Sequence, residues 1–189
     1  MIIGLVGFRY SGKTEVGKIL SNNRFKVVSF GDEVRLERIA RGLPDDYDLH
    51  KLGVDLRKEF GPRYWGARVL GKMIWAGFEN YVAEGMRTIG DLEVFQNIPG
   101  FVLVGVTASD ELRWERCRTK NRGRPDDTDN YEEFLKRDLR DRSSDEGGLQ
   151  SEALFGRRKY TMDNDGDLIN LEARTINLLQ ELNSLGFRG

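Results

Sequence analysis

The segment Gly7-Phe8-Arg9-Tyr10-Ser11-Gly12-Lys13-Thr14 decides the fold of this chain. It fits the pattern G-x-x-x-x-G-K-[ST] at every fixed position. The apolar run Ile2–Val6 before it is typical of a buried strand, and Gly12–Leu20 after it has the periodicity of a helix. Strand, glycine loop and helix in this order are the context that the motif requires. The segment is therefore predicted to form a P-loop, a loop that binds phosphate groups.

Each fixed position of this segment has a chemical reason. Gly7 and Gly12 permit the backbone angles that turn N–H groups toward a phosphate. The helix that follows points its positive end at the same anion. Lys13 is placed to reach the β- and γ-phosphates, and the hydroxyl of Thr14 to bind Mg²⁺. All eight residues of the segment are predicted to bind the nucleotide, with ATP and Mg²⁺ as the cofactors.

Apolar runs and amphipathic stretches alternate through the rest of the chain. Alternation of this kind indicates βαβ units and a mainly parallel sheet. The sequence thus predicts an α/β fold, the three-layer P-loop NTPase fold, with a parallel five-stranded sheet and a small helical lid, in one domain of residues 1–189. The predicted strands are Ile2–Val6, Phe25–Phe30, Tyr81–Glu84, Phe101–Val106 and Tyr160–Met162; helical periodicity covers residues 49–60, 65–74, 112–120, 131–142 and 168–182.

Composition excludes several classes of function. The chain has 189 residues, a formal net charge of −1, one cysteine and one histidine. A single Cys117 excludes an internal disulfide, and a single His50 excludes a two-histidine metal site. No apolar run approaches the roughly 18 residues of a membrane span, and the balanced charge gives no global attraction to nucleic acid. We expect a cytoplasmic protein, a monomer or homodimer, that binds neither membrane nor nucleic acid.

The rest of the sequence separates the classes of P-loop protein. A switch GTPase would carry an Asn-Lys-x-Asp segment that recognises the base, and the sequence has none. A motor-type ATPase would carry a strand that ends in Asp-Glu, and none is visible. Eight arginines fall between Arg113 and Arg142. Guanidinium groups grip phosphate oxygens in a fork, so this density favours an enzyme that transfers phosphoryl groups.

Three further segments resemble those of nucleoside monophosphate kinases, in the same order along the chain. The stretch 29–35, Ser-Phe-Gly-Asp-Glu-Val-Arg, is similar to the Ser-Thr-Gly-Asp-x-x-Arg segment of adenylate and uridylate–cytidylate kinases. The stretch 81–87, Tyr-Val-Ala-Glu-Gly-Met-Arg, resembles their hydrophobic–Asp-Gly-x-Pro-Arg segment, with Glu in place of Asp and without the Pro. Residues 123–127, Gly-Arg-Pro-Asp-Asp, resemble their lid, although Arg137 follows at a longer spacing than in short-lid kinases.

The resemblance implies a role for each matching residue. Arg35 and Arg87 would hold the phosphate of the acceptor, at the carboxyl ends of neighbouring strands where open α/β sheets bind ligands. Arg116, Arg124 and Arg137 would close over the donor phosphates from the lid. Residues 32–80 would form the acceptor-binding helices and residues 119–130 the tip of the lid. The predicted catalytic residues are Lys13, Arg87, Arg124 and Arg137.

Two acids are candidates for the metal. Asp32 and Glu84 each end or follow a predicted strand, and either is able to hold Mg²⁺ or to accept a proton or hydrogen bond from the acceptor. We favour Asp32 as metal ligand, together with Thr14, and count Asp32 among the acceptor-binding residues. A helix N-cap would account for Asp32 equally well.

Other segments resemble different relatives. Leu52-Gly53-Val54-Asp55-Leu56-Arg57 and Glu59-Phe60-Gly61-Pro62 resemble a small archaeal group of adenylate-kinase-related proteins, and Arg57 is counted with the acceptor-binding residues. The segment 160–166, Tyr-Thr-Met-Asp-Asn-Asp-Gly, resembles the end of dephospho-coenzyme A kinases. By that resemblance Asn164 would lie near the adenine of ATP. Tyr64, Trp65 and Trp75 are expected to pack in the core rather than to stack on a base.

The sequence thus favours an ATP-dependent kinase whose acceptor is a nucleoside or deoxynucleoside monophosphate. A dephospho-coenzyme A kinase or a related metabolite kinase is the first alternative. A nucleotide-binding regulator or weak ATPase that works through a protein partner is the second. In each kinase case the partner is a small molecule that accepts a phosphoryl group.

Overall fold

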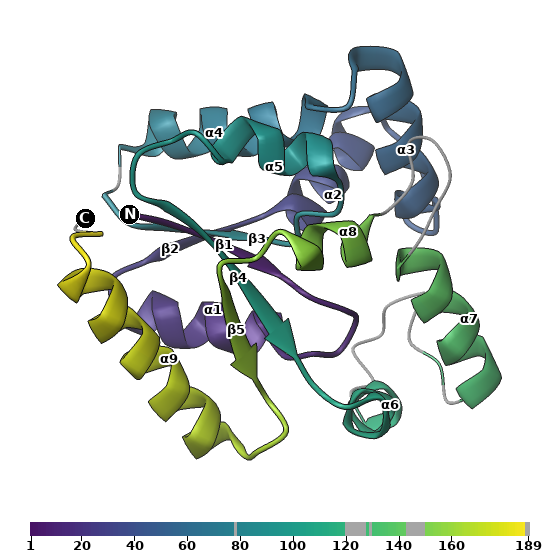
Figure 1. Ribbon diagram of the computed structural model, residues 1–189. Helices are drawn as coiled ribbons and strands as arrows, with labels where there is room; N and C mark the ends of the chain where they lie inside the picture. Colours follow the sequence, from purple (N-terminus) through teal and green to yellow (C-terminus); the bar gives the residue numbers. More distant parts are fainter. Residues whose placement is uncertain (78, 120–127, 129, 143–149, 188–189) are drawn as a thin grey trace.

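A computed structural model of the chain describes residues 1–77, 79–119, 128, 130–142 and 150–187. Five parallel strands form its sheet in the order β2-β3-β1-β4-β5, which confirms the predicted fold class (Figure 1). The strands are β1 (Ile2–Val6), β2 (Lys26–Ser29), β3 (Tyr81–Glu84), β4 (Phe101–Thr107) and β5 (Tyr160–Asp163).

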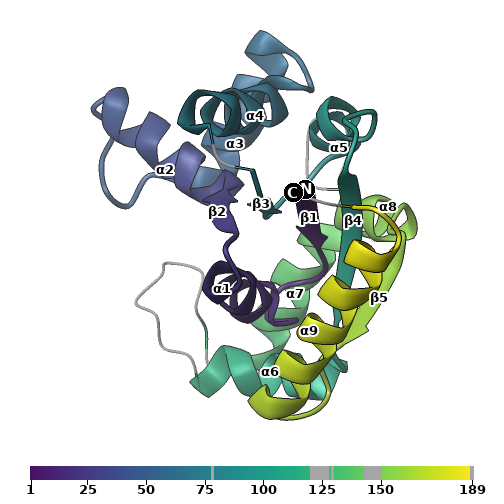
Figure 2. The ribbon, with the colours of Figure 1, turned by 90° about the vertical axis from the view of Figure 1, so that its left-hand side faces the viewer.

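Helices cover both faces of this sheet, so that the molecule has three layers. The helices are α1 (Lys13–Asn22), α2 (Phe30–Ala40), α3 (Leu49–Phe60), α4 (Tyr64–Ala76), α5 (Ile89–Phe95), α6 (Asp110–Thr119), α7 (Tyr131–Arg142), α8 (Ser151–Gly156) and α9 (Leu168–Ser184). Figures 1 and 2 show α1 and α9 on one face and α4 and α5 on the other. None of the helices in the described part of the chain combines the length and apolar character that a bilayer crossing needs.

The central strand β1 shows why the chain folds in layers. Successive side chains of a strand point to opposite faces. Ile3 and Leu5 therefore enter the core beside α1 and α9, and Val6 enters the core on the opposite face. A strand buried on both faces is apolar throughout, as the sequence of β1 is. Because all five strands are parallel, their carboxyl ends and the loops that follow lie along one edge of the sheet.

Three helices have no counterpart among the predicted stretches of helical periodicity. Helix α2 begins directly after β2, where the Ser29 hydroxyl accepts a hydrogen bond from the backbone N–H of Asp32. Helix α5 begins with a capping box in which Thr88 and Asp91 satisfy each other's backbone N–H groups. Helices α5 and α8 have seven and six residues. An apolar pattern of period 3.6 cannot be recognised over one or two turns.

The aromatic residues of α4 correct one expectation. Trp65 is fully buried, as expected, and packs with Val69 and Met73 on one stripe of the helix. Trp75, in contrast, is 90% exposed, and Ile74 is 72% exposed. One and two residues after Met73, these side chains are rotated by about 100° and 200° away from the buried stripe. The prediction that Trp75 packs in the core was therefore wrong. Cys117 is buried, as a small packed side chain should be.

Candidate phosphate site

The segment Gly7–Thr14 lies at the carboxyl edge of the sheet, between β1 and α1, as the motif predicts. Gly7 has a φ of 148° and Gly12 a φ of 102°, which an L side chain adopts only with strain. A Cβ on Gly7 would lie 2.1 Å from the carbonyl oxygen of Val106 in β4, and one on Gly12 would lie 2.0 Å from Nδ2 of Asn164. Close approach of the loop to its neighbours thus requires glycine at both positions.

Asn164 and Arg116 hold the loop from outside. Buried Asn164, directly after β5, donates a hydrogen bond from Nδ2 to the carbonyl oxygen of Ser11 at 2.8 Å. Arg116 of α6 donates to the carbonyl oxygens of Asn164, at 2.7 Å, and Tyr10, at 3.4 Å. Both residues also line the large cavity at this edge of the sheet. Their contacts brace the backbone of the loop, whichever part of a nucleotide lies beside them.

Lys13 points over the loop. Its Nζ donates to the carbonyl oxygens of Gly7 at 2.8 Å and Phe8 at 2.6 Å. Burial, followed by repulsion from Arg87, lowers the pKa of Lys13 to about 7, against an opposing influence of Glu84. A bound anion would favour the charged form of this amine. The charged form of Lys13 would thus be stabilised by a bound anion, because Glu84 offsets the burial and the repulsion from Arg87 only in part.

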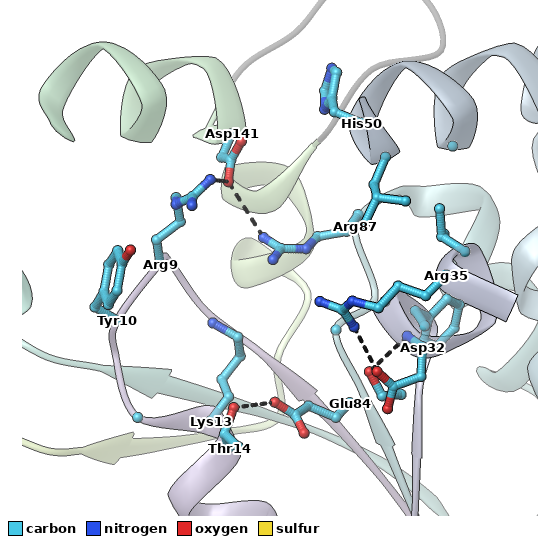
Figure 3. A pocket seen from close by; sticks show the side chains of 18 of the residues that line it. Arg9, Tyr10, Lys13, Thr14, Asp32, Arg35, His50, Glu84, Arg87 and Asp141 are labelled. Carbon is cyan, nitrogen blue, oxygen red and sulfur yellow. Dashed lines mark hydrogen bonds and ion pairs between the residues drawn. The ribbon is translucent and has the colours of Figure 1, made fainter. Parts of the chain in front are cut away.

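The two candidate acids lie in different surroundings (Figure 3). The hydroxyl of Thr14 donates to Oε1 of Glu84, at the end of β3, at 2.7 Å. Asp32 instead forms an ion pair with Arg35 one turn later on α2, with the atoms 2.6 Å apart. The geometry therefore groups Thr14 with Glu84, whereas the sequence favoured Asp32 as the partner of Thr14. A hydroxyl and a carboxylate together are an oxygen donor set of the kind that Mg²⁺ binds.

One cavity joins the loop to the predicted acceptor side. Its volume is about 1110 Å³, and Lys13, Arg35 and Arg87 all line it. The side that we call the acceptor side, after this prediction, is formed by the ends of β2 and β3 and by the start of α3, where half-buried His50 also faces the cavity. The predicted residues in the lining are Arg9, Tyr10, Gly12, Lys13, Thr14, Asp32, Arg35, Arg57, Arg87, Arg116, Arg137 and Asn164.

Arg57 is in this lining, but its guanidinium binds another side chain of the protein. The side chain is buried and its Nη2 lies 3.2 Å from Oδ2 of fully buried Asp91. The same carboxylate oxygen accepts hydrogen bonds from the backbone N–H groups of Arg87 and Thr88, each at 3.0 Å. Arg57 thus braces the turn that carries Arg87. This role through Asp91 could not be read from the spacing of the residues.

The lid residues are only partly described. Arg137 of α7 lines the cavity and forms an ion pair with Glu133 one turn earlier. Arg124 and most of the predicted lid tip, residues 119–130, lie outside the described residues. The helices on either side of the predicted lid tip, α6 and α7, are bound to the loop through Arg113, which is almost fully buried. Arg113 donates to the carbonyl oxygen of Arg9 at 2.9 Å and to both oxygens of Asp138 in α7, at 2.6 and 2.8 Å.

Sequence reasoning missed Asp141, which also lines the cavity. Its carboxylate lies 3.3 Å from Nη1 of Arg9 and 3.8 Å from Nη1 of Arg87. Figure 3 shows Asp141 reaching from the end of α7 toward both arginines, above Lys13. The alternating charges of residues 137–142 are typical of a solvated helix face. The sequence offered only a weak signal, namely that Asp138 and Asp141 interrupt an arginine-rich stretch.

The sheet order, the P-loop after the central strand and the arginines around one cavity define a protein with the P-loop kinase fold. TT1252 from Thermus thermophilus has a TM-score of 0.67 at 19% identity, covering 96% of this chain and 97% of that one. A shikimate kinase from Bacteroides thetaiotaomicron has a TM-score of 0.64 at 17% identity, covering 97% and 98%. A shikimate kinase from Acinetobacter baumannii in complex with shikimate has a TM-score of 0.60 at 19% identity, covering 99% and 95%. At these identities the likeness establishes the fold alone.

The chain belongs to the UPF0200 family. A UPF0200 protein of Hyperthermus butylicus is 32% identical over 187 residues, which are 98% of this chain and 97% of the relative. A UPF0200 protein of Methanosarcina mazei is 34% identical over 145 residues, 75% of this chain and 76% of the relative. No family model matches the chain.

Proposed function

We propose that this protein is a kinase that transfers the γ-phosphoryl group of ATP to the phosphate of a nucleoside or deoxynucleoside monophosphate. The observation that carries the proposal is that Arg35 and Arg87 line the same cavity as Lys13. Arg35 lies in α2, the helix that follows β2, and Arg87 follows the end of β3, the strand next to β2 in the sheet. Transfer between two nucleotides brings several negative charges together. Cations on both sides of the reacting groups neutralise these charges.

In this proposal each side of the cavity has one task. The loop Gly7–Thr14 and Lys13 hold the donor phosphates, Arg35 and Arg87 hold the acceptor, and Arg116, Arg124 and Arg137 act from the lid. Lys13 bears its charge where the transferred group becomes most negative, so it acts on the transition state. Residues 1–189 then act as a single kinase domain, with the acceptor helices in residues 32–80.

Thr14 and Glu84 are the residues that we propose to hold Mg²⁺, on the strength of their 2.7 Å contact. The ion supplies positive charge that neutralises the donor phosphates. Asp32 then remains for the acceptor side, where it orients Arg35. Glu84→Gln should raise the Mg²⁺ concentration needed for half-maximal rate by about tenfold, because it removes the negative charge of the ligand while one oxygen remains. Asp32→Asn is the matched control; an equal effect of both variants would contradict this assignment.

The matching fold of shikimate kinases and a gluconokinase favours a second candidate, a kinase of small hydroxylated metabolites. Asp32 supports it, because a carboxylate that is two-thirds exposed in the cavity is placed to accept a hydrogen bond or proton from a hydroxyl group. Dephospho-coenzyme A, which accepts a phosphoryl group on a hydroxyl, belongs to the same class. A nucleotide-binding regulator would have less need for arginines on the acceptor side.

One assay separates these functions. Purified protein with ATP and Mg²⁺ is tested for ADP release with nucleoside monophosphates, deoxynucleoside monophosphates, dephospho-coenzyme A, shikimate and gluconate, and the product is identified by mass. We expect release to depend on a monophosphate and to yield its diphosphate. Turnover of a hydroxylated metabolite instead would support the second candidate. Slow ADP release that ignores every acceptor would contradict both and favour the regulator.

A further inference from the structure

Asp141 joins the two sides of the cavity. It lies in the last turn of α7 and meets Arg9 of the donor loop and Arg87 of the acceptor side with a single oxygen, Oδ2 (Figure 3). A carboxylate presents two anionic oxygens along one edge, and so does a phosphate group. In this structure it therefore stands where an anion bridging Arg9 and Arg87 would stand.

The carboxylate of Asp141 is held loosely for a buried group. Its side chain is 4% exposed, yet Oδ1 accepts no hydrogen bond from any described residue, and Nε of Arg140 is 4.0 Å away. Asp138, one turn earlier, binds Arg113 at 2.6 and 2.8 Å and Arg142 at 2.8 Å. A buried carboxylate that is incompletely bonded costs free energy. The Asp141 contacts are therefore the ones that a ligand can replace.

We propose that Asp141 occupies the anion position between Arg9 and Arg87 and raises the affinity that an incoming anion needs, so that dianionic phosphate groups bind and monoanionic carboxylates do not. The proposal rests on the proposed role of Arg87 in holding the acceptor. An incoming carboxylate only replaces one charge of −1 by another. A phosphate monoester near neutral pH brings about one charge more and gains attraction to the arginines beyond what Asp141 gave up. Asp141 is thus a specificity residue for acceptors that carry a phosphate.

The test compares two simple anions, sulfate as dianion and acetate as monoanion, by calorimetry at constant ionic strength. The wild type should bind sulfate and show no measurable binding of acetate. Removal of the internal competitor in Asp141→Asn should tighten sulfate binding roughly five- to tenfold, because the competent fraction of the site rises. Acetate binding should strengthen by the same factor and become measurable, because either anion has to displace the same carboxylate. Glu132→Gln, an exposed acid on the same helix, removes the same charge and should change neither constant.

Two results would overturn the proposal. If Asp141→Asn binds sulfate more weakly, Asp141 positions the arginines and does not compete with the ligand. If Asp141→Asn and Glu132→Gln behave alike, only the net charge matters. Thermal unfolding checks that each variant is folded, and Asp141→Ser repeats the test should the Asn variant fail to fold. Because no turnover is measured, absence of kinase activity would refute the proposed function and leave this result intact.

Discussion

The loop side and the acceptor side of the cavity are built in different ways. The loop Gly7–Thr14 is shaped by backbone conformation and by buried contacts, such as that of Asn164 with the Ser11 carbonyl. The acceptor side carries side chains that pair with one another in solvent: Asp32 is 66% exposed beside Arg35, and Asp45 is fully exposed beside Arg38.

This difference separates what is fixed from what is adjustable. Backbone N–H groups present the same donors whatever the neighbouring side chains are, so the loop side suits the single use that we propose for it, the binding of phosphate. Exposed ion pairs contribute only about 0–1 kcal/mol each, so a ligand can separate them at little cost. We therefore expect large effects from changes on the loop side and smaller, ligand-specific effects on the acceptor side.

The largest effect is expected from Lys13→Ala. Loss of a charge that acts on the transition state should lower kcat by about 10²–10³, comparable to loss of a preorganised hydrogen-bond donor. The variant should remain folded, because Lys13 lies in the loop and its Nζ bonds only to carbonyl groups of that loop in the described structure. Kinetics and thermal unfolding check both statements. Lys18→Ala, exposed on the same helix, is the control; near-normal transfer in Lys13→Ala would end the assignment of the loop as catalytic.

Gly12→Ala tests whether backbone shape defines the loop side. The substituted residue must keep a φ near 102°, and its methyl group must displace Nδ2 of Asn164, 2.0 Å away. Strain and the disturbed hydrogen bond should lower the free energy of unfolding by about 2 kcal/mol or more. Gly71→Ala in α4 is the matched control, since nothing lies within 4 Å of its Cβ, and it should stabilise by about 0.5–1 kcal/mol. Equal denaturation midpoints for the two variants would contradict the statement that backbone shape defines the loop side.

Arg87→Ala and Arg35→Ala test the acceptor side. Loss of a charge-assisted contact worth about 1.5–3 kcal/mol should raise the KM of the acceptor by roughly tenfold or more. The KM of ATP should stay within about twofold, because neither arginine belongs to the loop. Separate titrations of ATP and acceptor measure the two constants. Weaker ATP with an unchanged acceptor would show that the two sites are reversed.

The smallest expected effect is the uptake of a proton by Lys13 when ATP binds. The pKa of Lys13 is lowered to about 7 by burial, so at about pH 8 the free protein holds this amine mostly neutral. A bound phosphate raises that pKa, and ATP binding should take up as much as about one proton. The lowered pKa also costs stability when Lys13 is charged, a cost that declines as pH rises from about 7 toward the unfolded value. Calorimetry in buffers of different ionisation enthalpy detects the uptake, which Lys13→Ala should abolish; release of protons would contradict it.

The sequence predicted the elements with a strong local signal. All five predicted strands exist, two with the predicted bounds and three with ends shifted by one residue, and the residues of the P-loop lie together as the motif requires. The short helices α5 and α8 gave no periodic signal, and Trp75 was assigned to the core although it lies off the buried stripe. Periodicity finds an apolar face only where a helix is long enough to repeat it.

What the sequence determined by itself is the phosphate loop and the parallel sheet that carries it, because both follow from local residue types and alternation. What only the tertiary structure decided is which side chains meet at the edge of that sheet. The pairing of Thr14 with Glu84 spans 70 positions of the chain, and that of Arg9 with Asp141 spans 132. Such contacts depend on strand order and helix orientation, which bring distant segments together in a way that no local pattern records.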